Sequence, residues 1–342
     1  MLPCRRTEAD GVRRRAWAGA RLLGGVLILA VLVWLLGAGP FLDGLRGLGP
    51  GTLLAAMVIG AVITVCSAWR WRVVAAALGV GLPLPGATAA YYRSQFLNST
   101  LPGGVVGDVH RGLRHGMDAG DLGRGVRAVI WERVAGQVVQ AAVAVAVLLT
   151  LPSPVRAALP QVVTVSVVAL GVLLLCGRGM ARHGPARAAR ALRAAAAEAR
   201  GVLLHPAAAR PVLVASLLVV GGHLGMFWLA ARAAGVDAPP QQLLPLALVV
   251  LLAAAIPLNV AGWGPREGAA AWVFAGTEWG AGAGAAVATA FGVLTLAAVL
   301  PGAAVLLAGR RHRASRAIRP AGPGREPAVV HSGTGEDGAA HG

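Results

Sequence analysis

The chain has 342 residues, of which 56% are hydrophobic and only 13% charged, and its mean hydropathy is +0.68. Because soluble domains carry about 25% charged residues, this composition excludes a set of water-soluble domains and indicates one membrane domain with several spans. It also excludes disorder over most of the chain, nucleic-acid binding as the main activity, and a disulfide scaffold, since the chain is apolar throughout and its three cysteines lie far apart.

Seven charge-free windows predict the membrane-spanning helices, because a helix needs about 20 apolar residues to cross the hydrocarbon core. In chain order they cover residues 22–42, 47–68, 134–155, 157–177, 211–231, 238–265 and 279–309. The stretch 73–92 is also uncharged, but glycines and prolines interrupt it, and we do not count it as a straight span. The windows predict an all-α polytopic integral membrane protein whose transmembrane domain covers residues 22–309.

The formal net charge is +17, and the 31 residues of the lysine-plus-arginine count are all arginine. Most of them lie before residue 22, between the second and third windows, between the fourth and fifth, and after residue 309. Since arginine-rich loops stay in the cytoplasm, we expect a plasma (inner) membrane protein with both termini in the cytoplasm. Residues 1–21 are then a basic cytoplasmic N-terminus, and residues 310–342 a disordered cytoplasmic tail.

The number of windows conflicts with this orientation, because seven crossings from a cytoplasmic N-terminus would leave the basic tail outside. The segment 238–278 must therefore contain a short eighth crossing or enter the membrane and return. Both solutions place irregular backbone at membrane depth, which is tolerated only where protein buries it or where it lines a wet cavity. We expect about eight transmembrane helices, including broken or re-entrant segments.

Two motifs rich in glycine and proline mark where such segments are expected. The first covers residues 97–111 and reads LNSTLPGGVVGDVHR, and the second covers 256–268 and reads IPLNVAGWGPREG. A pair of Gly/Pro-interrupted apolar segments is the best sequence indication of a transporter-like site, and it also suggests an inverted repeat. Broken helices present amide donors and positive helix ends, which suit an anionic head group. The alternative is a pair of tight loops between ordinary spans.

Opposite charges close both motifs: Asp108 with Arg111, and Arg266 with Glu267. A charge flanked by apolar residues costs about 2.5–3.5 kcal/mol to insert into a membrane, so such charges usually face a protein interior and form pairs. We therefore expect an acid–base cluster around a wet cleft.

A third charged pair, Glu132 and Arg133, is expected at the cytoplasmic start of the third span. On a helix, Glu132, Gly136 and Gln140 recur every four residues on one face. Our hypothesis is that Glu132 pairs with Arg111 or Arg93 beneath the first motif, and the alternative is an interfacial ion pair that anchors a helix end.

The candidate residues fall into two groups. The predicted substrate-binding residues are Arg93, Asn98, Asp108, Arg111, Glu132, Arg133, Asn259, Arg266 and Glu267. The residues predicted to shape the backbone are Pro102, Gly103, Gly104, Gly107, Pro257, Gly262 and Gly264. We expect no catalytic residue, metal or cofactor, because the chain lacks a nucleophile elbow, a P-loop, a dinucleotide fingerprint and metal-ligand spacing.

Three patterns resemble the lysylphosphatidylglycerol synthase transmembrane (flippase-like) family: N-x-x-L-P-G-G-x-x-G-D-x-x-R at 98–111, E-R-x-x-G at 132–136 and G-x-G-x-R-E-G at 262–268. The resemblance covers roughly residues 15–310. It implies a membrane domain that moves an aminoacylated phospholipid between leaflets. In the best-known members a separate cytosolic domain makes that lipid from aminoacyl-tRNA. Only 33 residues follow Gly309, so we do not expect synthesis here. Some stand-alone members are associated with polyprenyl-linked sugar metabolism.

Three further features each have a structural interpretation as well as a functional one. Residues 180–205 predict a basic amphipathic helix that anchors at the membrane surface. Gly276, Gly280 and Gly284 form a stripe that favours close helix packing within the bundle, with a homo-oligomer contact as the alternative. His223 lies inside the fifth window, where a structural role competes with a proton relay.

We therefore expect a protein that binds, and translocates between leaflets, an anionic phospholipid or lipid-linked head group. The alternatives are a membrane transferase acting on a lipid-linked sugar or an aminoacyl lipid, and a non-transporting accessory protein of cell-envelope synthesis. The expected partners are membrane lipids and, under the accessory interpretation, envelope-lipid biosynthetic enzymes; nucleic acid is not expected.

Overall fold

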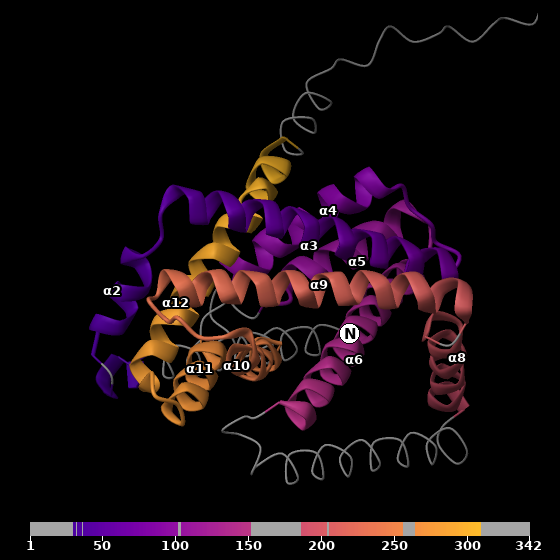
Figure 1. The fold of residues 1–342 in the computed structure, drawn as a ribbon. Coiled ribbons are helices and arrows are strands. Elements are labelled where there is room, and N and C mark those ends of the chain that lie inside the picture. The colour runs from indigo at the N-terminus through magenta and orange to yellow at the C-terminus, as the bar shows by residue number, and fades with distance from the viewer. Residues whose placement is uncertain are drawn as a thin grey trace, which may run out of the picture. The chain divides into compact units, whose positions relative to one another are not determined.

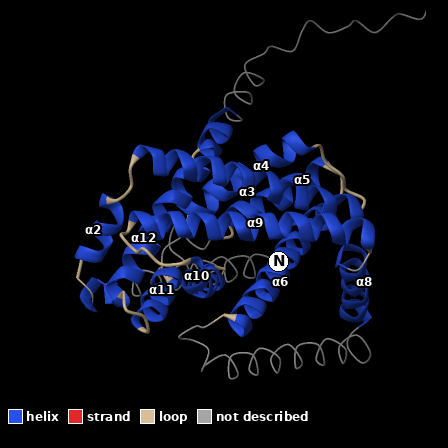
Figure 2. Ribbon diagram, viewed as in Figure 1, coloured by secondary structure: helices blue, strands red, loops and turns tan. Residues whose placement is uncertain are grey.

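The computed structural model describes residues 30–31, 33–35, 37–101, 104–151, 186–203, 205–255 and 264–308, and throughout these ranges it contains helices and loops without a strand (Figures 1 and 2). The chain divides into a compact unit of residues 1–305 and a second unit of residues 306–342. The helices are α2 (Gly39–Arg46), α3 (Pro50–Ala77), α4 (Leu84–Thr100), α5 (Val106–Asp118), α6 (Leu122–Thr150), α8 (Ala186–Leu203), α9 (Pro206–Ala233), α10 (Pro240–Ala254), α11 (Pro265–Ala275) and α12 (Gly280–Val299).

Four helices are long and apolar enough to cross a membrane: α3, α6, α9 and the stretch Gly280–Ala308, which is α12 with its continuation. The protein is therefore a multi-pass, all-helical membrane protein in the part that the structure describes. The predicted count of about eight spans is not reached there. The window 157–177 lies outside the described residues, and so do residues 22–29, 32 and 36 of the first window and the tail 310–342.

The membrane helices extend past the charge-free windows that predicted them. The second window ends at residue 68 but α3 continues to Ala77, and the third begins at residue 134 but α6 already begins at Leu122. The side chain of Asp121 caps α6 by accepting a hydrogen bond from the Arg124 amide at 2.9 Å. Glu132 therefore lies inside α6 rather than in its first turn, and where the membrane begins along this helix stays a prediction.

Helices α4 and α5 flank the first Gly/Pro motif and pack against each other. Gly107, at the start of α5, allows this contact, because a Cβ atom there would lie 2.0 Å from the Ser94 carbonyl oxygen of α4. Gly104 has φ +62°, a left-handed conformation that favours glycine. Pro102 and Gly103 lie outside the described residues.

The segment 238–278 forms two short helices, α10 and α11, rather than one long span. Neither is long enough alone to count as a membrane span, so the choice between two crossings and re-entry stays open. Residues 256–263 between them lie outside the described residues, and with them Pro257, Asn259 and Gly262. Gly264 precedes α11 with φ +131°.

The predicted glycine stripe does not lie on one helix. Gly276 ends α11, whereas Gly280 begins α12 after a turn, with φ +73°. At Gly284 a Cβ atom would lie 2.3 Å from the Ala270 carbonyl oxygen of α11, so this glycine serves packing within the chain. The homo-oligomer contact stays a prediction.

The core joins α3, α9 and α12, and α3 and α9 run side by side (Figure 1). Phe227, Phe274 and Phe291 are buried in its largest hydrophobic cluster, and a Cβ atom at Gly60 would lie 2.3 Å from the Ala298 Cβ atom. The predicted amphipathic helix corresponds to α8, where Glu198 accepts hydrogen bonds from Arg127 and Trp131 of α6. These contacts leave α3, α4, α5 and α6 to surround a polar interior.

Candidate functional site

A buried carboxylate, Glu132 of α6, stands at the centre of the polar interior with an exposed fraction of 0%. Its Oε1 atom accepts hydrogen bonds from Arg70 Nε at 2.9 Å, Arg70 Nη2 at 2.6 Å and the Tyr91 hydroxyl at 3.2 Å. Arg70 belongs to α3 and also donates from Nη1 to Ser216 Oγ of α9 at 3.1 Å. One ion pair therefore connects three membrane helices.

Arg111 of α5 joins this carboxylate to a second one. Its Nη2 atom lies 3.0 Å from Glu132 Oε2 and 3.0 Å from Asp108 Oδ1. The guanidinium also lies over two aromatic rings, 4.5 Å from the Trp71 centroid and 4.2 Å from the Tyr91 centroid. Such cation–π contacts are strongest where water is excluded, and Arg111 is 1% exposed. The predicted pairing of Glu132 with Arg111 is present.

Asp108 connects the first motif to α6. Its Oδ2 atom lies 2.8 Å from Arg133 Nη2, and the carboxylate also accepts hydrogen bonds from Ser94 and from the Asn98 amide at 3.1 Å. The side-chain oxygen Oδ1 of Asn98 in turn accepts a hydrogen bond from the backbone N–H of Gly107 at 2.7 Å. Burial alone would raise the pKa of Asp108, but the adjacent Arg133 and Arg111 lower that pKa to about 2.

The second motif forms its own buried pair at the start of α11. Glu267 is fully buried, and its Oε2 atom accepts a hydrogen bond from the Gly264 amide at 2.6 Å. Its Oε1 atom accepts from Arg266 Nε at 2.9 Å. A carboxylate at the third position of a helix compensates the unpaired amides there, which explains why an acid follows the Gly-Pro turn.

A cavity of about 260 Å³, which we call the central cavity, is lined by residues of α3, α4, α6, α9, α10, α11 and α12. Arg70, Arg133 and Arg266 contribute to its wall, and among the described residues no aspartate or glutamate lines it. Its other polar lining residues are Ser67, Tyr91, Gln95, Gln137, Gln140, His223 and Thr295. The second motif reaches this cavity through Arg266, whereas no residue of the first motif lines it and Asp108 of that motif contacts its wall through Arg133. The expected meeting of the two motifs at one cavity therefore stays a prediction.

The buried charges around the central cavity do not balance. Four arginines (Arg70, Arg111, Arg133 and Arg266) accompany three carboxylates (Asp108, Glu132 and Glu267). Four of the remaining acids form ion pairs elsewhere: Asp43 with Arg46, Asp121 with Arg124, Glu198 with Arg127, and Asp237 with Arg232. Among the described residues, these seven side chains therefore carry one more positive charge than negative charges.

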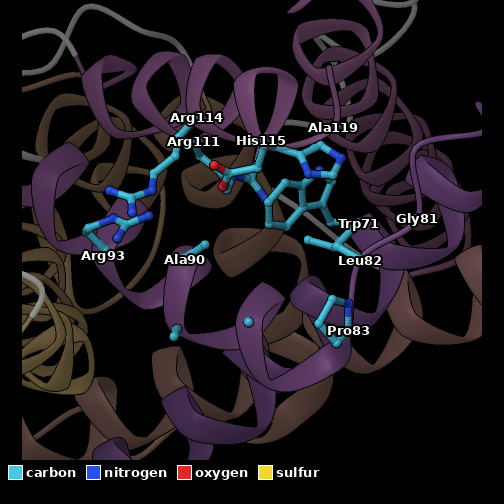
Figure 3. Close-up of a pocket in the computed structure, with 13 residues that line it drawn as sticks. Trp71, Gly81, Leu82, Pro83, Ala90, Arg93, Arg111, Arg114, His115 and Ala119 are labelled. Atoms are coloured by element: carbon cyan, nitrogen blue, oxygen red, sulfur yellow. The ribbon is translucent and has the colours of Figure 1, made fainter. Parts of the chain in front are cut away.

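A second cavity of about 360 Å³, which we call the α5 cavity, lies beside the same network (Figure 3). Arg93 and Arg114 lie at one end of it, and Trp71 and His115 at the other (Figure 3). Arg111 lines this cavity, whereas Tyr91, on which Arg111 stacks, lines the central cavity. The stacked pair therefore belongs to the wall between the two cavities.

The structure brings most of the predicted residues together. Asn98, Asp108, Arg111, Glu132 and Arg133 form one network, and Arg266 with Glu267 faces the same cavity through Arg266. Arg93 instead lines the α5 cavity. Asn259 lies outside the described residues, so its placement stays a prediction.

Sequence analysis missed Arg70, Gln95 and Gln137, and it named Gln140 only as part of the helix face that carries Glu132. Arg70 was counted among the loop arginines, although it lies inside α3 and is 5% exposed. The periodicity at Gly136 contained a signal, because a Cβ atom there would lie 2.8 Å from the Arg70 guanidinium carbon. Gln137 and Gln140 follow on the same helix and line the cavity. His223 lines it too, and its Nδ1 atom lies 2.8 Å from the Val219 carbonyl oxygen.

The arrangement suits binding of an anion rather than metal chemistry. Among the described residues, no group of three His, Cys, Asp or Glu side chains is placed to hold a metal ion. Arginine and glutamine side chains donate several hydrogen bonds each, and planar guanidinium groups match phosphate oxygens.

Comparison with known proteins agrees with the motifs. A search of curated proteins and a search of solved structures found no match. The family model described as the lysylphosphatidylglycerol synthase TM region matches residues 22–302, which include both motifs and every residue of the buried network. The chain belongs to the lysylphosphatidylglycerol synthase transmembrane-region family.

Proposed function

We propose that this protein binds the anionic head group of a phospholipid or lipid-linked molecule in the central cavity and passes it between the two leaflets. The observation that carries the proposal is the excess of positive charge, among the described residues, around a cavity whose described lining has three arginines and no acid. A charge buried at membrane depth is costly unless it is compensated, and a monoanionic phosphodiester would compensate it.

The surroundings of the cavity support transfer rather than chemistry. Its wall combines guanidinium groups with amide side chains, which bind and release a head group without forming a bond to it. We propose that the protein is not an enzyme, that it lies in the plasma membrane with both termini in the cytoplasm, and that the lipid's own imbalance or an ion gradient supplies the energy.

A leaflet-exposure assay tests the transfer. Purified protein is reconstituted into phosphatidylcholine vesicles with a trace of phosphatidylglycerol labelled on its acyl chain, and an impermeant reductant bleaches the outer label. With the protein present, inner-leaflet label is expected to become accessible to the reductant. Arg266→Gln is expected to slow this about tenfold, because one charge-assisted hydrogen bond contributes about 1.5–3 kcal/mol. Label that stays protected in wild-type vesicles would contradict the proposal.

The control for this variant is Arg232→Gln. Arg232 is exposed, pairs with Asp237 and lies outside the central cavity. The same loss of charge there is expected to leave the rate of transfer unchanged. Equal slowing in both variants would assign the effect to net charge rather than to the cavity.

The same charge balance predicts which head group is preferred. Because no acid among the described residues lines the central cavity, an aminoacylated lipid with an added amine finds no carboxylate partner there, and we expect phosphatidylglycerol to move faster than its lysyl derivative. Gln137→Glu adds a carboxylate to the wall and is expected to reduce that preference. Gln242→Glu makes the same change at an exposed position of α10 and is the control. The test measures the transfer rates of the two lipids in the same vesicles. Equal rates in the wild type would refute this preference without contradicting transfer itself.

A further inference from the structure

The α5 cavity holds buried polar atoms whose hydrogen bonds are not made. Arg111 uses Nη2 for two carboxylates, but its Nε and Nη1 atoms have no hydrogen-bond partner in the described part of the chain. The same holds for the indole nitrogen of Trp71 and for Nε2 of His115. These three residues are 1%, 1% and 7% exposed. A buried polar group left unpaired costs about 1–3 kcal/mol, so three such side chains around one cavity point to a molecule that pairs with them.

The charge of the cavity selects what that molecule is. Three arginines line it (Arg93, Arg111 and Arg114), against one carboxylate, Asp118, which is exposed. They come from two helices, since Arg93 belongs to α4 and the other two to α5. Water would satisfy these hydrogen bonds, but an anion also interacts favourably with the guanidinium groups, so an anion is the better partner.

We propose that the α5 cavity is a second anion site, which binds a phosphate group and is separate from the lipid site in the central cavity. A phosphate offers several acceptor oxygens to guanidinium groups that approach from different helices. The cavity volume of about 360 Å³ accommodates a phosphate with a small substituent, and Leu82, Pro83 and Ala90 give one wall an apolar surface. A lipid head group and a soluble phosphate compound present the same chemistry here.

The site is connected to the proposed lipid site through a single side chain. Arg111 contributes to the wall of the α5 cavity while its Nη2 atom lies 3.0 Å from Glu132, whose other oxygen pairs with Arg70 of the central cavity. A phosphate that draws the Arg111 guanidinium would therefore weaken its pairing with Glu132. The inference itself does not depend on lipid transfer, because the unpaired donors are present whatever the central cavity binds.

The test uses the full chain in detergent without phosphate. Inorganic phosphate is titrated while the thermal unfolding midpoint is measured, with chloride at matched ionic strength as the reference. A saturable rise above the chloride reference is expected, since a ligand of the folded state raises its stability. Arg114→Gln is expected to weaken the apparent phosphate affinity about tenfold, as the loss of one charge-assisted hydrogen bond implies. Arg114→Lys keeps the charge but loses the planar guanidinium group, and its phosphate affinity is expected to lie between those of the wild type and Arg114→Gln.

Arg124→Gln is the matched control, because Arg124 is an exposed arginine nearby in sequence that pairs with Asp121. It is expected to bind phosphate like the wild type. If Arg114→Gln lowers the thermal unfolding midpoint even without phosphate, the phosphate affinity of Arg114→Lys is compared with that of the wild type instead. A wild-type response equal to that of chloride, or equal phosphate affinity in the wild type and Arg114→Gln, would overturn the proposal.

A second arm identifies the source of the phosphate. The titration is repeated in nanodiscs of phosphatidylglycerol and in nanodiscs of an uncharged glycolipid. If phosphatidylglycerol abolishes the phosphate response and the glycolipid does not, a lipid head group occupies the α5 cavity. If both keep the response, the ligand is a soluble phosphate compound. Either result supports the site, and neither bears on transfer through the central cavity, to whose wall Arg114 does not contribute.

Discussion

At the scale of single residues, Glu132 is the side chain on which the site depends. It is fully buried in a helix apolar enough to cross a membrane, and two arginines and a tyrosine hydroxyl contact it. Removing one member of such a buried pair costs about 3–5 kcal/mol, whereas apolar residues in place of the whole network would stabilise the fold at least as well. A stability requirement alone therefore does not explain these charges, which agrees with the binding role that we propose for them.

Asp108 predicts how stability depends on pH. Its folded pKa of about 2 lies below the ordinary value of 3.8, so its contribution is fully present above about pH 4 and is lost as the pH falls toward 2. Asp108→Asn is expected to lower the unfolding midpoint by a constant amount between pH 8 and pH 5, and the gap is expected to close below about pH 4. Thermal unfolding in detergent across this range measures it. A gap that persists undiminished at pH 3 would show that the charge of Asp108 is not what stabilises the fold.

At the scale of elements, the contact between α4 and α5 holds the first motif in shape. Asn98, near the end of α4, bonds both the Gly107 amide and the Asp108 carboxylate at the start of α5. A local loop sequence thereby positions an acid beside Arg111 and Arg133. The helix pair and the charged network depend on each other.

Gly107→Ala tests that dependence. A methyl group would lie 2.0 Å from the Ser94 carbonyl oxygen, a backbone atom that cannot rotate away, so α5 must shift. Overpacking of this kind costs about 1–3 kcal/mol, and we expect a lower unfolding midpoint together with slower lipid transfer. Gly221→Ala in α9 is the control, since no atom lies within 4 Å of the added methyl group there. Similar losses in the two variants would count against a special role for the close approach.

The limits of sequence reasoning are also visible at this scale. Charge-free windows located α3, α6, α9 and α12, because the length of an apolar run follows from consecutive residues alone. They misplaced the ends of α3 and α6, since Arg70 and Glu132 neutralise each other and so allow helices to continue through charged residues. A window that stops at every charge does not detect such pairing.

At the scale of the whole molecule, the candidate site was predictable only where its residues lie close together in the sequence. Motif residues such as Asp108 and Arg111 are three positions apart, and their pairing was expected. Arg70 and Glu132 are separated by 62 residues, and Arg70 and Ser216 by 146, so these contacts follow from helix packing. Gln95 of α4 and Gln137 of α6 were missed for the same reason, because only the folded arrangement shows which helix faces meet the cavity.

The partners of Glu132 bear on how the protein is made. Translation begins at the N-terminus, so Arg70 and Arg111 are both synthesised before Glu132. Arg70 must therefore wait for its acid while 62 positions are read. In a chain that ends before α6, the Arg70 guanidinium would lack its Glu132 carboxylate. We therefore expect membrane quality control to degrade such truncated chains.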